Sequence, residues 1–104
     1  MSRFYLSPDA NRDLDEIESY LDSLPREPAI RGGSAIMQTL LGIADHPYQG
    51  AAHSTLSRIL GMEVRSRLTF PYRIYYRLDK NAPEVIAILH MARDTRSILI
   101  ERFQ

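Results

Sequence analysis

Hydrophobic residues recur with a helical period in the first half of the chain. Between residues 10 and 24 they are spaced alternately by four and three positions, which predicts an amphipathic helix with one buried seam. The seam consists of Ala10, Leu14, Ile17, Leu21 and Leu24. Ser7-Pro8-Asp9 is typical of a helix start, because serine caps free N–H groups and proline fits the first helical position. The outer face of this helix is acidic, with Asp13, Asp15, Glu16, Glu18 and Asp22.

A second helix is predicted over residues 28–45, and the His46-Pro47 pair ends it. Its apolar residues form two adjacent stripes, so we expect burial on two sides, against the first helix and against a sheet. One stripe is Ala29, Gly33, Ile36, Leu40 and Ile43, and the other is Ile30, Met37, Leu41 and Ala44. Gly32-Gly33 either permits a close approach of the two helices or marks a local break. The residues that follow, to about Gly61, are expected to form a loop.

The second half of the chain shows the two-residue period of β-strands. Residues 62–69 and 72–79 alternate apolar and polar side chains. The next segment, from Val85, is an almost unbroken apolar run, which is typical of a strand covered on both faces. A short strand at residues 3–6, a turn at 81–83 that contains Pro83, and a short terminal helix after Asp94 complete the expected elements. The predicted fold is α+β: an N-terminal strand and a helical hairpin packed on an antiparallel sheet, in one domain of residues 1–104.

The alternation also predicts how the strands at 62–69 and 72–79 pair. An odd-numbered connection, such as residues 70–72, would keep both apolar sets on one face and would oppose Leu68 to Ile74. The same register gathers the basic residues of the two strands on the other face. This expected arginine face consists of Arg65, Arg67, Arg73 and Arg77, with Tyr75 beside Arg67. Like charges across a sheet repel, so the face requires acidic neighbours or a partner.

The formal net charge of zero conceals an electrical asymmetry. Residues 1–52 carry four arginines and eight acidic residues, whereas residues 53–104 carry eight arginines, Lys80 and five acidic residues. Either the basic half meets an anionic partner or the two halves neutralise each other. The chain has 104 residues and no cysteine, and it shows neither a long apolar run nor a signal peptide, so we expect a cytoplasmic protein.

Few residues form a pattern typical of catalysis. His90, at the end of an apolar strand, is the obvious acid–base candidate, although a packed structural histidine is the more common finding. No metal-ligand spacing, phosphate-binding glycine loop or nucleophile elbow is present, so we expect neither a metal nor a cofactor. The expected arginine face could bind nucleic-acid phosphate, with Tyr75 stacking on a base, or an acidic protein surface, or it could be internally paired.

Several short motifs resemble those of the RelE/ParE family of bacterial toxins, from toxin–antitoxin pairs. They are Leu6-Ser-Pro-Asp-Ala10, Asp13-Leu-Asp-Glu-Ile17, His46-Pro47 with Gly50, Pro71-Tyr-Arg-Ile-Tyr-Tyr-Arg77 and His90-x-x-Arg-Asp94. Their order and spacing cover nearly the whole chain. The first and fourth are typical of the ParE branch. The sequence departs from the nuclease branch, because Lys80 lies in a predicted turn and Met91 stands where some of those nucleases carry tyrosine.

The resemblance implies a ParE-like toxin that poisons DNA gyrase by binding and is neutralised by a ParD-like antitoxin in a hetero-oligomer. It implies no membrane and no sequence-specific nucleic-acid contact. The antitoxin is expected to contact Arg65, Arg67, Arg73, Tyr75 and Arg77. The alternative is a RelE-like toxin that cleaves messenger RNA on the ribosome, with a reduced catalytic site of Arg65, Arg67, Arg73 and His90.

Overall fold

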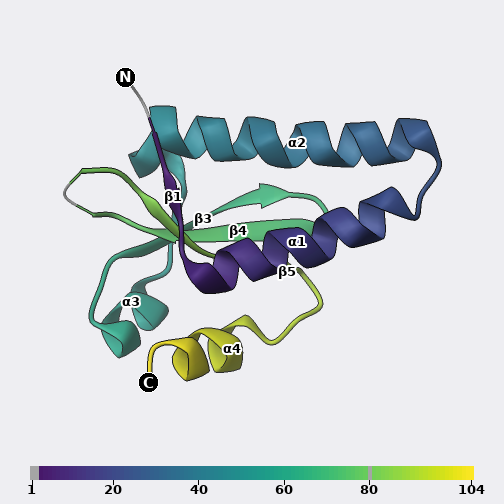
Figure 1. The fold of residues 1–104 in the computed structure, drawn as a ribbon. Helices are drawn as coiled ribbons and strands as arrows, with labels where there is room; N and C mark the ends of the chain where they lie inside the picture. The colour runs from purple at the N-terminus through teal and green to yellow at the C-terminus, as the bar shows by residue number, and fades with distance from the viewer. Residues whose placement is uncertain (1–2, 80) are drawn as a thin grey trace.

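The structure is a computed structural model that describes residues 3–79 and 81–104 (Figure 1). Its elements are β1 (Tyr5–Leu6), α1 (Pro8–Asp22), α2 (Arg26–Asp45), the 3₁₀ turn η1 (Pro47–Gln49), β2 (Ala51–Ala52), α3 (Ser54–Leu60), β3 (Val64–Thr69), β4 (Tyr72–Arg77), β5 (Glu84–His90) and α4 (Thr95–Arg102). The strands form a five-stranded sheet in the order β1-β5-β4-β3-β2. β1 runs parallel to β5, and the other neighbours are antiparallel. The predicted α+β class is therefore confirmed.

Helices cover both faces of the sheet. α1 and α2 pack on one face, over a cluster that includes Ile74, Tyr76 and Ile88. α3 and α4 pack on the other face, where Leu56 and Leu99 meet Val64, Tyr75 and Ile86. β5 contributes buried residues to both clusters, as its unbroken apolar run predicted. The prediction of a loop to Gly61 was wrong, because β2 and α3 form there; α3 has only seven residues, too few for a clear period.

The start of α1 follows the sequence prediction. Ser7 caps the helix by accepting a hydrogen bond from the Ala10 backbone N–H at 3.1 Å, and Pro8 occupies the first turn. Ala10, Ile17 and Leu21 of the predicted seam are buried. None of the helices described is long and apolar enough to cross a membrane.

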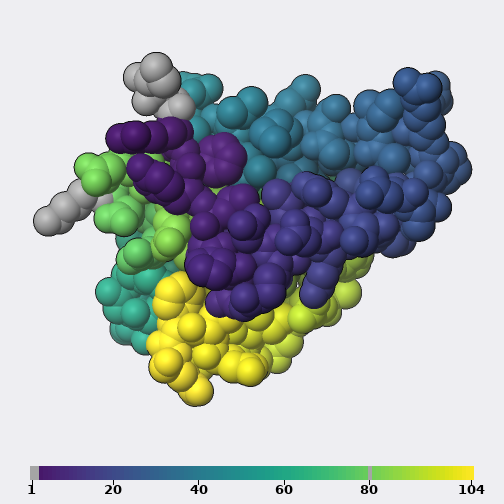
Figure 2. Space-filling model, viewed as in Figure 1, coloured from purple at the N-terminus to yellow at the C-terminus, as the bar shows by residue number. Residues whose placement is uncertain are grey.

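Asp13 is the exception on α1. It was expected on the outer face but is only 9% exposed, because it lies three positions after Ala10 and four before Ile17, within the buried seam. Its carboxylate accepts hydrogen bonds from the Arg102 guanidinium at 2.7 and 2.8 Å and from the Ile88 backbone N–H at 3.0 Å. The same guanidinium donates to the Ile86 carbonyl at 3.0 Å. One ion pair thus joins α1, β5 and α4. α1 (purple) and α4 (yellow) lie side by side in Figure 2.

α2 is continuous through Gly32 and Gly33. A Cβ on Gly32 would lie 2.8 Å from the Leu21 side chain, so this glycine permits the close approach of the two helices, whereas Gly33 has no neighbour within 4 Å of such a Cβ. The first apolar stripe is buried at Ile36, Leu40 and Ile43. The expected burial of the second stripe was wrong: Ile30, Met37 and Leu41 are 55%, 50% and 51% exposed, because α1 and the sheet both pack against the first stripe.

The predicted register of β3 and β4 was wrong by one residue. Only Phe70 and Pro71, joined by a cis peptide bond, connect the strands, so Thr69 pairs with Tyr72. Leu68 therefore opposes Arg73 instead of Ile74 and is 50% exposed. Side chains paired across a sheet share a face. In the observed register Arg67 therefore shares a face with Ile74, and Leu68 shares the other face with Arg73. Lys80, which was expected in the turn between β4 and β5, lies outside the described residues.

Removal of the Asp13–Arg102 ion pair should destabilise the fold strongly. Arg102→Ala leaves a carboxylate that is 10% exposed without its cationic partner, and loss of one member of a buried pair costs about 3–5 kcal/mol. Arg12→Ala is the matched control, because Arg12 and its partner Asp9 lie at the surface, where such pairs contribute about 0–1 kcal/mol. Urea denaturation of the two variants measures the difference. Equal losses would show that the ion pair does not anchor α4.

Candidate functional site

The expected arginine face does not exist as a single surface. Arg65 and Arg67 oppose Tyr76 and Ile74, so they lie on the face that α1 and α2 cover. Arg73 opposes Leu68 and therefore lies on the other face, toward α3 and α4. Arg77 opposes Val64, again on the α3 and α4 side. The one-residue change of register divides the four side chains into two pairs, each with different surroundings.

Arg65 and Arg77 are engaged within the chain. Arg65 donates to the Tyr48 and Gly50 carbonyls at 2.9 and 3.0 Å and to the Glu63 carboxylate at 2.7 Å, so it anchors η1 and β2 to β3. Arg77 donates to the Glu84 carboxylate at 2.6 Å across the β4–β5 ladder. Both guanidinium groups therefore have internal partners, one of the outcomes that the sequence left open.

Arg67 is not satisfied in the same way. Its Nη1 atom is buried and has no hydrogen-bond partner in the described part of the chain. The guanidinium lies against α2 at Gly42, where a Cβ would come within 2.7 Å of Nη1 and would displace it. A buried N–H donor without an acceptor costs about 1–3 kcal/mol, more for a charged group. Arg67 thus carries an unmet requirement for an anionic or carbonyl acceptor.

A hollow of about 430 Å³ adjoins Arg67 between α2 and β3, and we call it the β3-edge groove. Its lining includes Gln38, Thr39 and Gly42 of α2 together with Arg67, Leu68 and Phe70. β2 pairs only with Arg65 and Ser66, so no described strand pairs with the outer edge of residues 67–69. Phe70 is 80% exposed beside this open edge. The groove therefore combines an unpaired strand edge, exposed apolar side chains and the guanidinium of Arg67, whose Nη1 atom is buried.

On the opposite face, Arg73 belongs to a polar cluster with His53 and Ser66. Arg73 Nη1 donates to Ser66 Oγ at 3.1 Å, and the same hydroxyl lies 2.6 Å from His53 Nε2. The His53 ring lies against Tyr75, with 5.4 Å between the ring centroids. Burial and, secondarily, the nearby Arg73 charge lower the pKa of His53 below its usual 6.5. The lowered pKa favours the neutral ring, and Nε2 shares a hydrogen bond with the Ser66 hydroxyl.

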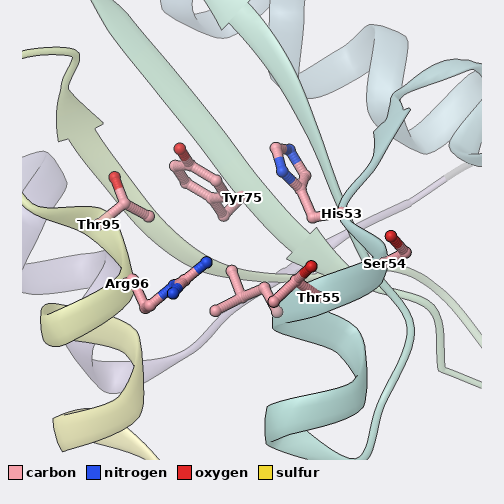
Figure 3. A pocket seen from close by; sticks show the side chains of 7 residues that line it. His53, Ser54, Thr55, Tyr75, Thr95 and Arg96 are labelled. Atoms are coloured by element: carbon pink, nitrogen blue, oxygen red, sulfur yellow. The ribbon is translucent and has the colours of Figure 1, made fainter.

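A hollow of about 270 Å³ lies in front of this cluster, between the starts of α3 and α4, and we call it the His53 pocket (Figure 3). His53, Thr55, Tyr75, Thr95 and Arg96 are among the residues that line it. The sequence prediction missed His53 because its partners Ser66 and Arg73 are distant in the chain. The one available signal was Ser66, a polar residue in the middle of an otherwise buried strand pattern.

His90 lies apart from these arginines. Its Nδ1 accepts a hydrogen bond from the Ala92 backbone N–H at 3.1 Å, and its ring meets the Tyr72 ring edge-on, with centroids 5.8 Å apart. The expected set of Arg65, Arg67, Arg73 and His90 is therefore not assembled, because Arg73 lies on the opposite face of the sheet from the other two arginines. No group of three or more described His, Asp or Glu residues has the arrangement of a metal site.

Comparison with known proteins identifies the class of protein first, a toxin of a toxin–antitoxin pair. A family model described as "ParE toxin of type II toxin-antitoxin system, parDE" matches residues 4–95, and the chain belongs to this family. The structure is similar to a solved one described as "Chromosomal ParDE TA system from P. aeruginosa", with a TM-score of 0.63 and 20% sequence identity over 86% of this chain and 96% of that chain. This likeness shows a shared fold. Comparison with curated protein sequences gives no match.

The lowered pKa of His53 predicts a pH-dependent stability. Between that pKa and 6.5 the unfolded chain binds a proton that the folded chain does not, so the free energy of unfolding should rise with pH through this window. Above 6.5 the contribution of this group becomes constant. Urea denaturation of the wild type and of His53→Gln at a series of pH values measures the difference. An identical rise in both proteins would assign the pH dependence to other groups.

Proposed function

We propose that this member of the ParE family poisons DNA gyrase in the bacterial cytoplasm and is neutralised by a ParD-like antitoxin within a hetero-oligomer. The match to the ParE family over residues 4–95 carries the proposal. The geometry supports binding over catalysis, because the residues expected for RNA cleavage lie on two faces of the sheet. The His53 ring is already hydrogen-bonded to Ser66, and no described carboxylate is bonded to it.

Purified protein should inhibit DNA supercoiling by purified gyrase and should increase the amount of cleaved DNA trapped on the enzyme. Prior addition of the antitoxin in molar excess should restore supercoiling. This control shows that the inhibition comes from this protein and not from a contaminant. Unchanged supercoiling at saturating protein would contradict the gyrase proposal. Cleavage of messenger RNA in a parallel assay on loaded ribosomes would instead support the RelE-like alternative.

The antitoxin, in our proposal, occupies the β3-edge groove. An extended peptide can add to the open edge of residues 67–69 by backbone hydrogen bonds, as strand-adding ligands do. An Asp or Glu side chain of that peptide would pair with the Arg67 guanidinium, which lines the groove. Charge complementarity therefore favours an acidic segment as the occupant.

Apolar residues around the groove extend the surface that an antitoxin would cover. Leu68 and Phe70 are exposed at the open edge, whereas Met37 and Leu41 are exposed on the second stripe of α2, which lies on a different side of that helix from the groove. An amphipathic helix continuous with the added strand would bury this stripe, at about 25 cal/mol per Å² of apolar area removed from water. Both stripes of α2 would then be buried in the complex, as the sequence pattern predicted for the monomer.

Only one of the expected antitoxin-binding residues lies in this groove. Arg67 lines it, whereas Arg65 and Arg77 bond within the chain and Arg73 and Tyr75 lie on the opposite face. We therefore assign the main electrostatic contact to Arg67. A role for the other four residues stays a prediction from the sequence.

Arg67→Met tests this assignment. The substitution removes a buried, unpaired donor, so the free energy of unfolding should stay unchanged or rise, whereas affinity for the antitoxin should fall by about 2–5 kcal/mol. Arg31→Met is the matched control, because Arg31 is exposed on the same helix that lines the groove and has only a distant ion pair with Glu27. Isothermal titration gives the affinities and urea denaturation gives the stabilities. Equal affinities of the two variants would place the interface elsewhere.

A further inference from the structure

We infer that the His53 pocket binds the phosphate group of a nucleotide, carried either by a free nucleotide or by a nucleic-acid strand. The inference goes beyond the proposed gyrase and antitoxin contacts, since it concerns the opposite face of the sheet. It is based on the arrangement of cationic, hydroxyl and aromatic groups around one hollow.

One guanidinium, that of Arg96, lines the hollow, and a second, that of Arg73, lies behind the lining, where it donates to Ser66. In the described part of the chain, neither Arg73 nor Arg96 lies within 4.0 Å of a carboxylate, whereas Arg12, Arg65 and Arg102 do. Asp94 is near Arg96 in the chain, but its carboxylate is bonded to Ser97, through the backbone N–H at 3.3 Å and the hydroxyl at 2.8 Å. The charges of Asp94 and Arg96 interact without a direct ion pair, so the planar N–H pairs of Arg96 are left to match two oxygens of a phosphate.

The neighbouring groups orient these charges and complete the set of donors. Arg73 is held by its hydrogen bond to Ser66, which in turn contacts the lining residue His53, so its charge is fixed behind the pocket wall. Thr55 and Thr95, from α3 and α4, line the same hollow, and their hydroxyls can donate to a third phosphate oxygen. Figure 3 shows Arg96 reaching from α4 toward α3, below the Tyr75 ring.

The aromatic wall distinguishes a nucleotide from a bare anion. Tyr75 lines the pocket beside the cations, and Leu56 contributes an apolar surface. A sugar or base attached to the phosphate would contact these side chains, since stacking on aromatic rings is a common mode of nucleotide recognition. The hollow of about 270 Å³ extends beyond the hydroxyl and guanidinium groups to this wall.

Nuclear magnetic resonance titration of the full chain tests the inference. Inorganic phosphate, adenosine 5′-monophosphate and a short single-stranded RNA should each cause saturable shifts of the His53, Tyr75, Thr95 and Arg96 signals. Arg96→Gln should weaken binding about tenfold or more, because it removes a charge-assisted hydrogen bond, and Arg73→Gln should weaken it less, because it removes a charge behind the pocket wall. Arg26→Gln is the matched control, because Arg26 is exposed at the start of α2, and this variant should bind like the wild type.

The relative affinities identify the source of the phosphate. Tighter binding of the mononucleotide than of the RNA would assign the pocket to a free nucleotide, and the reverse order would assign it to a strand. An absence of saturable shifts with all three probes would overturn the inference, as would shifts that persist undiminished in both pocket variants. A spectrum of each variant without ligand, compared with that of the wild type, separates loss of binding from loss of fold. Gyrase inhibition is measured separately and does not depend on this outcome.

Discussion

The ion pair between Asp13 and Arg102 is the constraint on which the rest of the structure depends. It brings together residues 89 positions apart and also binds the backbone of β5 through Ile86 and Ile88. Both side chains are largely buried, and the hydrogen bonds to Asp13 raise the pKa of Arg102, which favours the charged guanidinium. Because the pair holds α4 against α1, α4 can cover the second face of the sheet and form one wall of the His53 pocket.

The register of β3 and β4 decides which chemistry each face carries. The two-residue connection at Phe70 and Pro71 places Arg67 under α2 and Arg73 under α3 and α4. One face thus presents an unsatisfied guanidinium beside an open strand edge, which suits an acidic peptide. The other presents arginines beside an imidazole, hydroxyls and a tyrosine ring, which suits a phosphate. In our two proposals, this small sheet thus presents two separate anion-binding surfaces.

The exposed second stripe of α2 is a further apolar surface, on a different side of that helix from the β3-edge groove. α2 has two apolar stripes, but in the monomer α1 and the sheet cover only the first of them. Together with Leu68 and Phe70, the second stripe lies where a partner is required to remove apolar area from water. Its burial is therefore a property expected of a complex, which explains why the sequence pattern overstated burial in the single chain.

The sequence by itself determined the α+β class, the capped start of α1, the seam of that helix and the doubly covered β5, because these follow from residues close together in the chain. The order and spacing of its short motifs also indicated the family. Only the tertiary structure decided that Asp13 is buried, that β3 and β4 pair one residue away from the expected register, and that His53 meets Ser66 and Arg73. Hydrophobic periodicity does not encode these features. They arise from a two-residue turn and from contacts between segments that the folded sheet alone brings together.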